Sequence, residues 1–429
     1  MSAVLGFIVL FILLFAGLPL AFTLGLVGTV GFGLAIGFGP AGSMAAQVTW
    51  DTLSSYPLSV LPLFVLMGNF VNHAGLSRDL YAASNAVVGH RRGGLAIATI
   101  MACGGFSAVS GSSLATAATM SSIALPSMKK YGYSESLSSG SVAAGGTLGI
   151  LIPPSVIMVI YGSLTETSVG KLFVAGVIPG VLGILFYALA VMILVRFRPD
   201  AGPAGPRLNM RDRLTSVRRV WLVLALFALV IGGIYGGAFT ATEAAGIGAS
   251  GACVIAMLKG VMTPSTLYRI LSDTVRTSAM LLAVLVGALI FANFINIAGT
   301  PRLIVDTIAQ LGLGPTGVLI GLIVFYLVLG CVFDSLAMIL LTIPVVFPLV
   351  QQFGFDPVWF GILVVVTVEI SLITPPIGMN IFVIRSMNPE IPISALFRGV
   401  IPFILADLVR LAIILMFPAL ILYLPAQMG

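Results

Sequence analysis

The sequence predicts an all-α polytopic membrane protein: an inverted-topology repeat with two re-entrant helical hairpins and two discontinuous spans. Of its 429 residues, 59% are hydrophobic and only 8% are charged, and the mean hydropathy is +1.16. Soluble globular domains carry about 25% charged residues. A transmembrane β-barrel would show weak alternating segments in place of long apolar runs. Helical spans therefore account for most of the chain.

The two halves of the chain also carry the same motifs in the same order. Pro153-Pro154 corresponds to Pro375-Pro376, and the residue numbers differ by 222. Upstream, residues 69–75 correspond to residues 293–299 at a difference of 224. Internal duplication of this kind is characteristic of secondary transporters.

Residues 1–56 are predicted to form an N-terminal scaffold. Residues 1–40 are apolar and are interrupted near Pro19, so two spans with a break at that proline fit them. The more polar residues 41–56 are expected to form a loop or a surface segment. Because the first charge in the chain is Asp51, the N-terminus lacks the basic region of a cleaved signal peptide and reads as a span.

The first repeat, residues 57–196, contains the clearest hairpin signal. Residues 93–128 are 36 consecutive uncharged residues, too many for one span of about 20 residues. Arg91-Arg92 precede this run and Lys129-Lys130 follow it, and clustered basic residues in short loops mark the cytoplasmic side. The segment is therefore expected to enter the membrane, turn at Ser110–Ser113 and return to the same side.

A discontinuous span is predicted at residues 136–165. This stretch is interrupted by Gly145-Gly146-Thr147 and then by Pro153-Pro154. Paired prolines remove two backbone donors and obstruct the preceding turn, so an unwound middle is expected. The other predicted elements of this repeat are a span at 57–73, an interfacial segment at 76–90 and a span at 172–195.

A basic linker, residues 197–219, separates the two copies. It is rich in Arg, Pro and Gly, which indicates a cytoplasmic and flexible connection. Residues 220–276 are predicted to contribute further scaffold spans and an interfacial segment at 262–276.

The second repeat and the last span are predicted in residues 277–429. Asp334 is the single charge in a run from 307 to 355 that again reads as a hairpin. Asp407 and Arg410 lie three residues apart in the last span and are expected to form a structural pair. The remaining predicted elements are a span at 277–298, a broken span at 357–384 and the last span at 396–424.

These segments give ten full crossings and place both termini on the outer side of the membrane. The second hairpin then opens to the side opposite the first, and its flanks lack the Lys/Arg pairs of the first hairpin. The two copies are therefore expected to be inverted relative to each other.

The predicted chemistry lies where the two turns meet the two broken spans. Broken helices expose carbonyl groups that suit Na⁺, and half-helix N-termini suit substrate carboxylates. The predicted site in the first copy comprises Ser110, Gly111, Ser112, Ser113, Gly145, Gly146, Thr147, Gly149, Ile152, Pro153 and Pro154. The predicted site in the second copy comprises Asp334, Ser335, Glu369, Ser371, Thr374, Pro375, Pro376 and Asn380. The Na⁺ ligands are expected among Ser110, Ser113, Gly149, Ile152, Ser371 and Thr374.

Asp334 and Glu369 are acids within predicted membrane segments, where ionisable residues are costly and are functional by default. A buried structural hydrogen bond is the rival interpretation for each of them. Single membrane serines, in turn, more often serve helix packing than ligand binding.

Other function classes find less support in the sequence. There is no G-x-x-x-x-G-K-[ST] motif, so ATP is not expected to be hydrolysed by this chain, and no nucleotide cofactor is predicted. The net charge of +6 lies mainly in short loops that set orientation, so no nucleic acid is expected as a partner. A membrane-embedded enzyme would need a nucleophile with its base, or a metal cluster, and neither is visible. A passive anion channel is the other alternative, and the closed Ser/Gly turns argue against it.

The glycine, serine and proline blocks at residues 104–119 and 144–155 resemble the large membrane subunit of TRAP transporters, the tripartite ATP-independent periplasmic transporters. Ile178-Pro179-Gly180 and Thr374-Pro375-Pro376-Ile-Gly378 fit the same family, and the likeness covers nearly the whole chain.

This resemblance implies a sodium-coupled importer of organic anions, such as dicarboxylates or sialic acid, with an elevator-type motion. It implies location in the bacterial inner membrane, with periplasmic termini. It also implies two partners: a soluble periplasmic substrate-binding protein, which selects the substrate, and a small four-helix membrane subunit. That subunit is absent from this chain and is expected to be a separate polypeptide.

Overall fold

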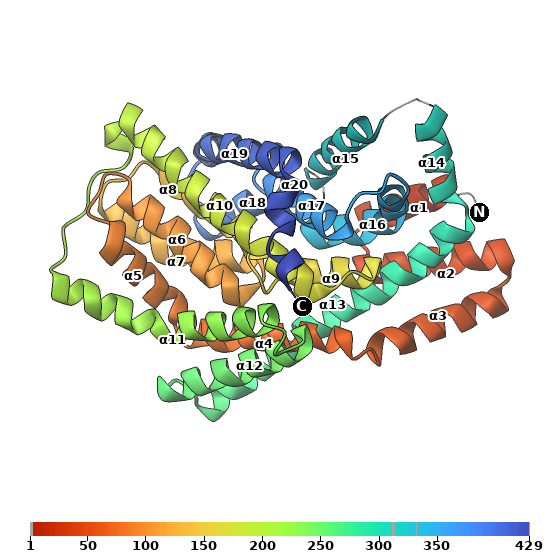
Figure 1. Cartoon of the computed structure of the whole chain (residues 1–429), viewed down its shortest axis with the longest axis horizontal. Coiled ribbons are helices and arrows are strands. Elements are labelled where there is room, and N and C mark those ends of the chain that lie inside the picture. Colours follow the sequence, from red (N-terminus) through yellow and green to blue (C-terminus); the bar gives the residue numbers. More distant parts are fainter. Residues whose placement is uncertain (1–2, 311–313, 332, 429) are drawn as a thin grey trace.

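The chain folds almost entirely into helices (Figure 1). The computed structural model describes residues 3–310, 314–331 and 333–428, and no strand occurs within these ranges. The all-α class predicted from the sequence is therefore confirmed.

The N-terminal region contains three helices. α1 (Ala3–Phe15) and α2 (Leu20–Ile36) are separated at the predicted break, and α2 starts directly after Pro19. Of the two expectations for residues 41–56, a loop or a surface segment, the loop is wrong, because most of them belong to α3 (Phe38–Leu53). Pro40 lies in the first turn of α3, where a missing backbone donor is harmless. Most side chains of α3 are partly or fully exposed, so the segment is a surface helix.

The first repeat begins with α4 (Val60–His73) and α5 (Leu76–Val88). Gly75 joins them with a φ of +69°, a left-handed conformation that glycine adopts without steric cost. Gly299, its partner in the sequence repeat, has a φ of +70° between α13 (Pro264–Ile297) and α14 (Thr300–Gln310). The duplication is therefore visible in the backbone as well as in the sequence.

A helical pair and a broken helix follow in the first copy. α6 (Gly94–Ser110) and α7 (Ser113–Lys130) are joined by only two residues, with Gly111 in the left-handed region. α8 (Glu135–Thr147), the short 3₁₀ helix η2 (Leu148–Ile150) and α9 (Val156–Thr165) make up the broken segment. α10 (Val169–Phe197) closes the copy.

The second copy repeats this order with α15 (Pro315–Gly330), α16 (Ser335–Gln352), α17 (Pro357–Ser371), α18 (Met379–Met387) and α19 (Ile393–Met416), followed by α20 (Pro418–Leu422). The predicted hairpin at 307–355 started too early. Residues 307–310 belong to α14, and the pair that matches α6 and α7 starts at Pro315. Residues 311–313 and 332 of this prediction lie outside the described residues.

The basic linker is more ordered than its composition indicates. Its second half belongs to α11 (Met210–Tyr235), which is followed by α12 (Ala241–Leu258). The Arg213 side chain donates from Nε to the Ala86 carbonyl at 2.8 Å and from Nη2 to His90 Nδ1 at 2.9 Å. Partial burial and three nearby guanidinium groups lower the pKa of His90, which favours the neutral ring that accepts this bond. These contacts hold the start of α11 against the end of α5.

The predicted interfacial segment 262–276 and span 277–298 form one helix. α13 has 34 residues, which is about 51 Å at 1.5 Å per residue. Thr263 caps it and Pro264 occupies its first turn, after which nothing interrupts the backbone. The charged residues Arg269, Asp273 and Arg276 are exposed on its first half. The amphipathic pattern was thus one end of a longer helix.

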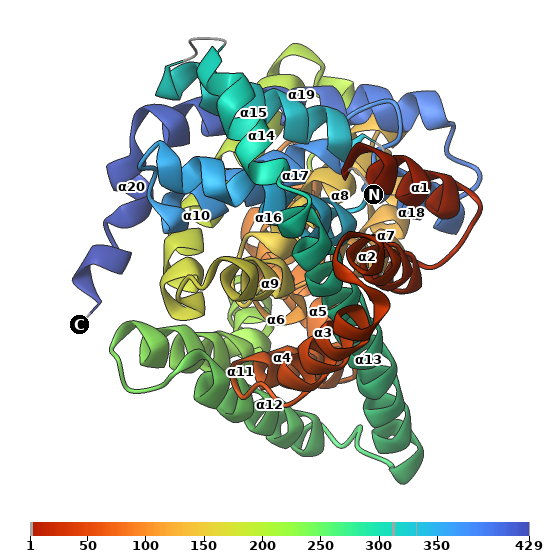
Figure 2. The same cartoon turned by 90° about the vertical axis from the view of Figure 1, so that its right-hand side faces the viewer.

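Helices of the first copy pack against helices of the second copy, in corresponding pairs. α8 of the first copy packs against α19 of the second, and α17 against α10; likewise α7 packs against α18, and α16 against α9. Figures 1 and 2 show α3, α4, α11 and α12 on one side of this group, while α13 packs along α2. Small residues allow the closest approach, since a Cβ on Gly140 would lie 2.2 Å from the Gly399 carbonyl oxygen.

Six of the described helices are long and apolar enough to cross a membrane: α10, α11, α12, α13, α16 and α19. A seventh span results if α3 and α4, which meet with a 59° bend, count together. The chain is therefore a multi-pass membrane protein. The count of ten crossings stays a prediction, because several predicted spans correspond to shorter helices.

Candidate functional site

A cavity of about 420 Å³ lies between the first helical pair and the start of α16. The turn Ser110–Ser113 lines it together with Asp334 and Ser335. The structure thus brings the two predicted turns to one cavity, although they are more than 200 residues apart in sequence. Further lining residues come from α4, α9 and α13, including Asn69, Asn72, Val156, Ile157 and Thr277.

Three helices begin at this cavity. The Ser112 hydroxyl accepts from the Ala115 amide at the start of α7, and the Ser155 hydroxyl caps α9 in the same way. The Asp334 carboxylate accepts from the Ala337 amide at 2.7 Å at the start of α16. Helix N-termini carry partial positive charge, so their convergence favours an anion. Asp334 adds a negative charge to the same cavity.

The first break is packed directly against the first turn. A Cβ on Gly149 would lie 2.5 Å from the Ser112 carbonyl oxygen, and one on Gly111 would lie 2.9 Å from the Pro154 carbonyl oxygen. Residues 137–155, which include Gly145, Gly146 and Pro153, are all buried. Ile152 lies against Gly180 of α10 in the same way. Glycine is required at 111 and 149 because any side chain would separate the turn from the break.

Asn380 joins the two copies at this point. The Ser113 hydroxyl donates to Asn380 Oδ1 at 2.9 Å, and Asn380 Nδ2 donates to the Ala143 carbonyl at 3.1 Å. Ser110 and Thr116 share a hydroxyl hydrogen bond of 2.9 Å at the same turn. Asn380 was predicted within the second broken span, and the structure places it against the first break.

The second break is more open than the first, and its hydroxyls, like those of the first turn, are hydrogen-bonded. The Ser371 hydroxyl donates to the Val368 carbonyl, and the Thr374 hydroxyl donates to the Ile370 carbonyl, both at 2.6 Å. Pro375 and Pro376 are exposed. Gly330 packs against Ser371, and Cys331 Sγ lies 3.5 Å from the Pro375 carbonyl oxygen. The end of α15 therefore contacts the second break, as the first turn contacts the first.

Glu369 lies in a buried polar cluster and does not line the cavity. Arg410 Nη2 lies 2.6 Å from the Glu369 carboxylate and 2.8 Å from that of Asp407. The Tyr187 hydroxyl donates to Asp407 at 2.6 Å and lies 3.1 Å from the Thr147 hydroxyl. Asp407 and Arg410 were predicted to form a structural pair. Glu369 and Thr147 belong to the same buried cluster, so a structural role fits them as well. All five side chains of this cluster are essentially inaccessible to solvent: those of Thr147, Tyr187, Glu369, Asp407 and Arg410.

The sequence prediction missed several cavity residues. Asn69 and Asn72 marked the repeat, yet they also line the cavity from α4, and Asn69 Nδ2 donates to Thr274 at 2.8 Å. Amide side chains inside an apolar span were the available signal. No signal of this kind marked Thr277. The prediction ended one segment at residue 276 and began the next at 277, whereas the structure has the single helix α13 there.

Hydroxyl, amide and carbonyl oxygens surround the first break, and hard cations prefer such ligands. Within residues 3–310, 314–331 and 333–428, no three His, Cys, Asp or Glu side chains gather as a transition-metal site would require. The chemistry of the donors therefore fits a monovalent or other hard cation.

Comparisons with known proteins agree on one family. The model of the family described as "Tripartite ATP-independent periplasmic transporter, DctM component" matches residues 7–420. The chain is 40% identical over 381 residues to the C4-dicarboxylate TRAP transporter large permease protein DctM of Pseudomonas aeruginosa, covering 89% of this chain and 88% of that protein. It is 33% identical to the sialic acid TRAP transporter large permease protein SiaM of Vibrio cholerae, covering 96% of each.

Among solved structures, the YdaH transporter of Alcanivorax borkumensis has a similar fold, with a TM-score of 0.63, 16% identity and 90% of each chain covered. The family match over nearly the whole chain and the identities above agree with the resemblance seen in the glycine, serine and proline blocks. The chain belongs to the DctM family, the large permease subunits of tripartite ATP-independent periplasmic transporters, and is a transport subunit and not an enzyme.

Proposed function

We propose that this chain forms the membrane pathway of a sodium-coupled secondary transporter that imports a small organic anion. The observation that carries the proposal is the cavity at which α7, α9 and α16 begin. The first turn supplies hydroxyls and backbone amides for a carboxylate, and the partial charges of three helix N-termini stabilise it. The relatives named for C4-dicarboxylate and sialic acid support a carboxylate substrate.

Sodium coupling has a physical reason in the same cavity. The Asp334 carboxylate would repel an anionic substrate across a space of only about 420 Å³. A bound Na⁺ would offset this repulsion, so substrate and cation would bind together. We expect the first Na⁺ among the hydroxyls of Ser110 and Ser113 and the carbonyls of Gly149 and Ile152, and the second among Ser371 and Thr374.

We further propose that the two copies are inverted, with the α6–α7 and α15–α16 pairs re-entrant from opposite sides. The exchange of partners between α7, α18, α16 and α9 is what a two-fold axis between the copies would produce. The basic flanks of the first pair, which the second pair lacks, support an axis in the membrane plane. In an elevator-type motion, these helices with α8, α10, α17 and α19 would move as one body against α2, α4, α11, α12 and α13. The basic linker would lie in the cytoplasm and both termini in the periplasm of a bacterial inner membrane.

A periplasmic binding protein would deliver the substrate, and a small four-helix membrane subunit would complete the complex. The word "tripartite" in the family description supports two partners for this chain. In this proposal the binding protein also selects the substrate.

Transport by the purified complex in liposomes tests the proposal. With the two partner proteins and a C4-dicarboxylate or sialic acid, substrate should accumulate only under an inward Na⁺ gradient. Equal uptake without any gradient would contradict coupling. Single-channel conductance of the reconstituted chain would favour the passive anion channel instead.

A further inference from the structure

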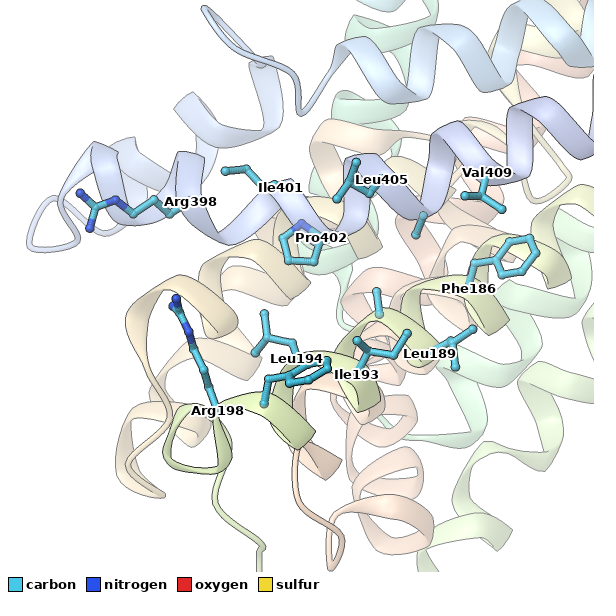
Figure 3. A pocket seen from close by; sticks show the side chains of 13 residues that line it. Phe186, Leu189, Ile193, Leu194, Arg198, Arg398, Ile401, Pro402, Leu405 and Val409 are labelled. Carbon is cyan, nitrogen blue, oxygen red and sulfur yellow. The ribbon is translucent and has the colours of Figure 1, made fainter.

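A second, larger cavity lies on the outside of the helix bundle, between α10 and α19. It is a groove of about 630 Å³, and Figure 3 shows the two helices running side by side along it. Its walls are apolar and include Leu189 and Ile193 of α10 and Ile401 and Leu405 of α19. Half or more of the surface of Ile193, Ile401 and Leu405 is exposed. In a membrane protein, such a surface faces hydrocarbon.

Two arginines mark one end of this groove. Arg198, just after α10, and Arg398, in the second turn of α19, both lie at that end in Figure 3. Both are exposed, and neither has a hydrogen bond or ion pair with the residues that the structure describes. Among the described residues that line the groove, they are the only ones with charged side chains. A long apolar groove with positive charge at one end is complementary to an amphiphile that has an anionic headgroup and an apolar tail.

We propose that this groove binds an anionic phospholipid, with its phosphate between Arg198 and Arg398 and an acyl chain along α10 and α19. Guanidinium groups present a planar fork that bonds phosphate oxygens in pairs, and basic pockets between membrane helices bind anionic headgroups. A zwitterionic lipid would not require two unpaired arginines. A free phosphate would leave the apolar trough without a function. The inference depends on the chain spanning a membrane and is independent of sodium coupling.

The arrangement also indicates a consequence for the fold. α10 and α19 pack against each other and come from different copies. A lipid that fills their outer groove would add apolar contacts to both helices at once. Bound lipid should therefore stabilise the junction of the two copies against thermal unfolding.

Native mass spectrometry of the purified full chain in detergent tests the proposal. Phosphatidylglycerol and phosphatidylcholine with identical acyl chains are titrated against the natural chain and against the R198Q/R398Q variant. We expect the natural chain to retain phosphatidylglycerol preferentially, and the variant to lose about tenfold in its affinity for that lipid. Binding of phosphatidylcholine should not change.

The matched control is R218Q/R219Q, which removes the same charge from two exposed residues of α11 that do not line the groove. If it lowers phosphatidylglycerol binding as much as R198Q/R398Q does, the groove has no special role and the proposal is wrong. Ala406→Trp, which narrows the trough and keeps both arginines, should also weaken phosphatidylglycerol binding. Unchanged binding in that variant would contradict the place assigned to the acyl chain.

Two further experiments, one by competition and one by crosslinking, distinguish the lipid from other possible occupants of the groove. Glycerol 1-phosphate, which has the head but no tail, should fail to displace the lipid at equal concentration; full displacement would indicate a soluble-anion site. Ile193→Cys should not crosslink to the small membrane subunit in the assembled complex. An efficient crosslink would show that this partner covers the groove and would overturn the proposal.

Discussion

The two breaks occupy equivalent positions in the repeat, yet their surroundings differ. Around the first, residues 148–155 are buried and packed against the turn of α6 and α7. Around the second, Pro375 and Pro376 are exposed and Thr374 is only half-buried. The duplication has kept the backbone path, while burial and chemistry have diverged.

Equivalent side chains show the same divergence. Ser112 corresponds to Asp334, Gly149 to Ser371 and Thr147 to Glu369, each at a difference of 222. The first copy supplies neutral oxygens and close backbone contacts, whereas the second supplies the charges. Substitutions in the first copy should therefore act mainly through packing, and those in the second through electrostatics.

The largest effect is expected at the charged cluster of the second copy. Arg410→Met would leave the Glu369 and Asp407 carboxylates buried without their cation, which typically costs about 3–5 kcal/mol. Thermal unfolding in detergent should show a large loss of stability. Ala188→Met places the same side chain at a half-buried position of α10, away from these carboxylates, and should cost far less. An unchanged midpoint for Arg410→Met would refute the electrostatic role of the cluster.

A packing effect is expected at the first break. Gly149→Val would force its side chain into the Ser112 carbonyl, which a Cβ already meets at 2.5 Å, and overpacking of this kind costs about 1–3 kcal/mol. Sodium-driven uptake should fall strongly. At the equivalent position of the second break, Ser371→Ala removes one hydrogen bond, which should cost about 1 kcal/mol of stability, and one proposed Na⁺ ligand. Equal loss of stability in both variants would abolish the packing distinction between the breaks.

The charge of the second turn offers a test that leaves packing intact. Asp334→Asn keeps a good helix cap, so stability should change by only a few tenths of a kcal/mol. Substrate binding should depend less on Na⁺, because the repulsion that we propose the cation offsets would be gone. The measurement is substrate affinity, by calorimetry, with and without Na⁺. A full Na⁺ dependence in the variant would show that Asp334 does not carry the coupling.

The smallest effects are expected at single hydroxyls. Ser113→Ala and Thr374→Val should each raise the Na⁺ concentration that half-activates uptake by several-fold while the fold stays intact, since each would remove one of several proposed oxygen ligands. Ser122→Ala, an exposed hydroxyl on α7, is the control. Unchanged Na⁺ activation in both test variants would mean that the ligands lie elsewhere.

Much of the architecture was predictable because glycine, proline and charge leave strong local signals. The uncharged run between Arg92 and Lys129 located α6 and α7, and the paired prolines located both breaks. The sequence was less informative for polar segments, because a polar segment can be either a loop or part of a helix. Residues 41–53 and 264–276 are polar enough to resemble surface segments, yet both are helical because nothing in them interrupts the backbone.

The candidate site was predictable only in part, because its residues meet across large distances in sequence. The prediction included both turns, but spacing alone gave no reason for Asn380 to bond Ser113 of the other copy. It also assigned Glu369 to the site, whereas Arg410 draws that carboxylate into a separate cluster. The roles of Asn380 and Glu369 depend on which distant residues they contact in the folded chain, and no local sequence pattern contains that information.

The central claim is that the two copies are inverted around one cavity. Single cysteines introduced as Lys130→Cys and Gln352→Cys, with Cys103, Cys253 and Cys331 replaced, place a label at the equivalent ends of α7 and α16, which are exposed. A membrane-impermeant thiol reagent added to intact cells should label position 352 and leave position 130 unlabelled. Labelling of both positions from the same side of the membrane would contradict the account.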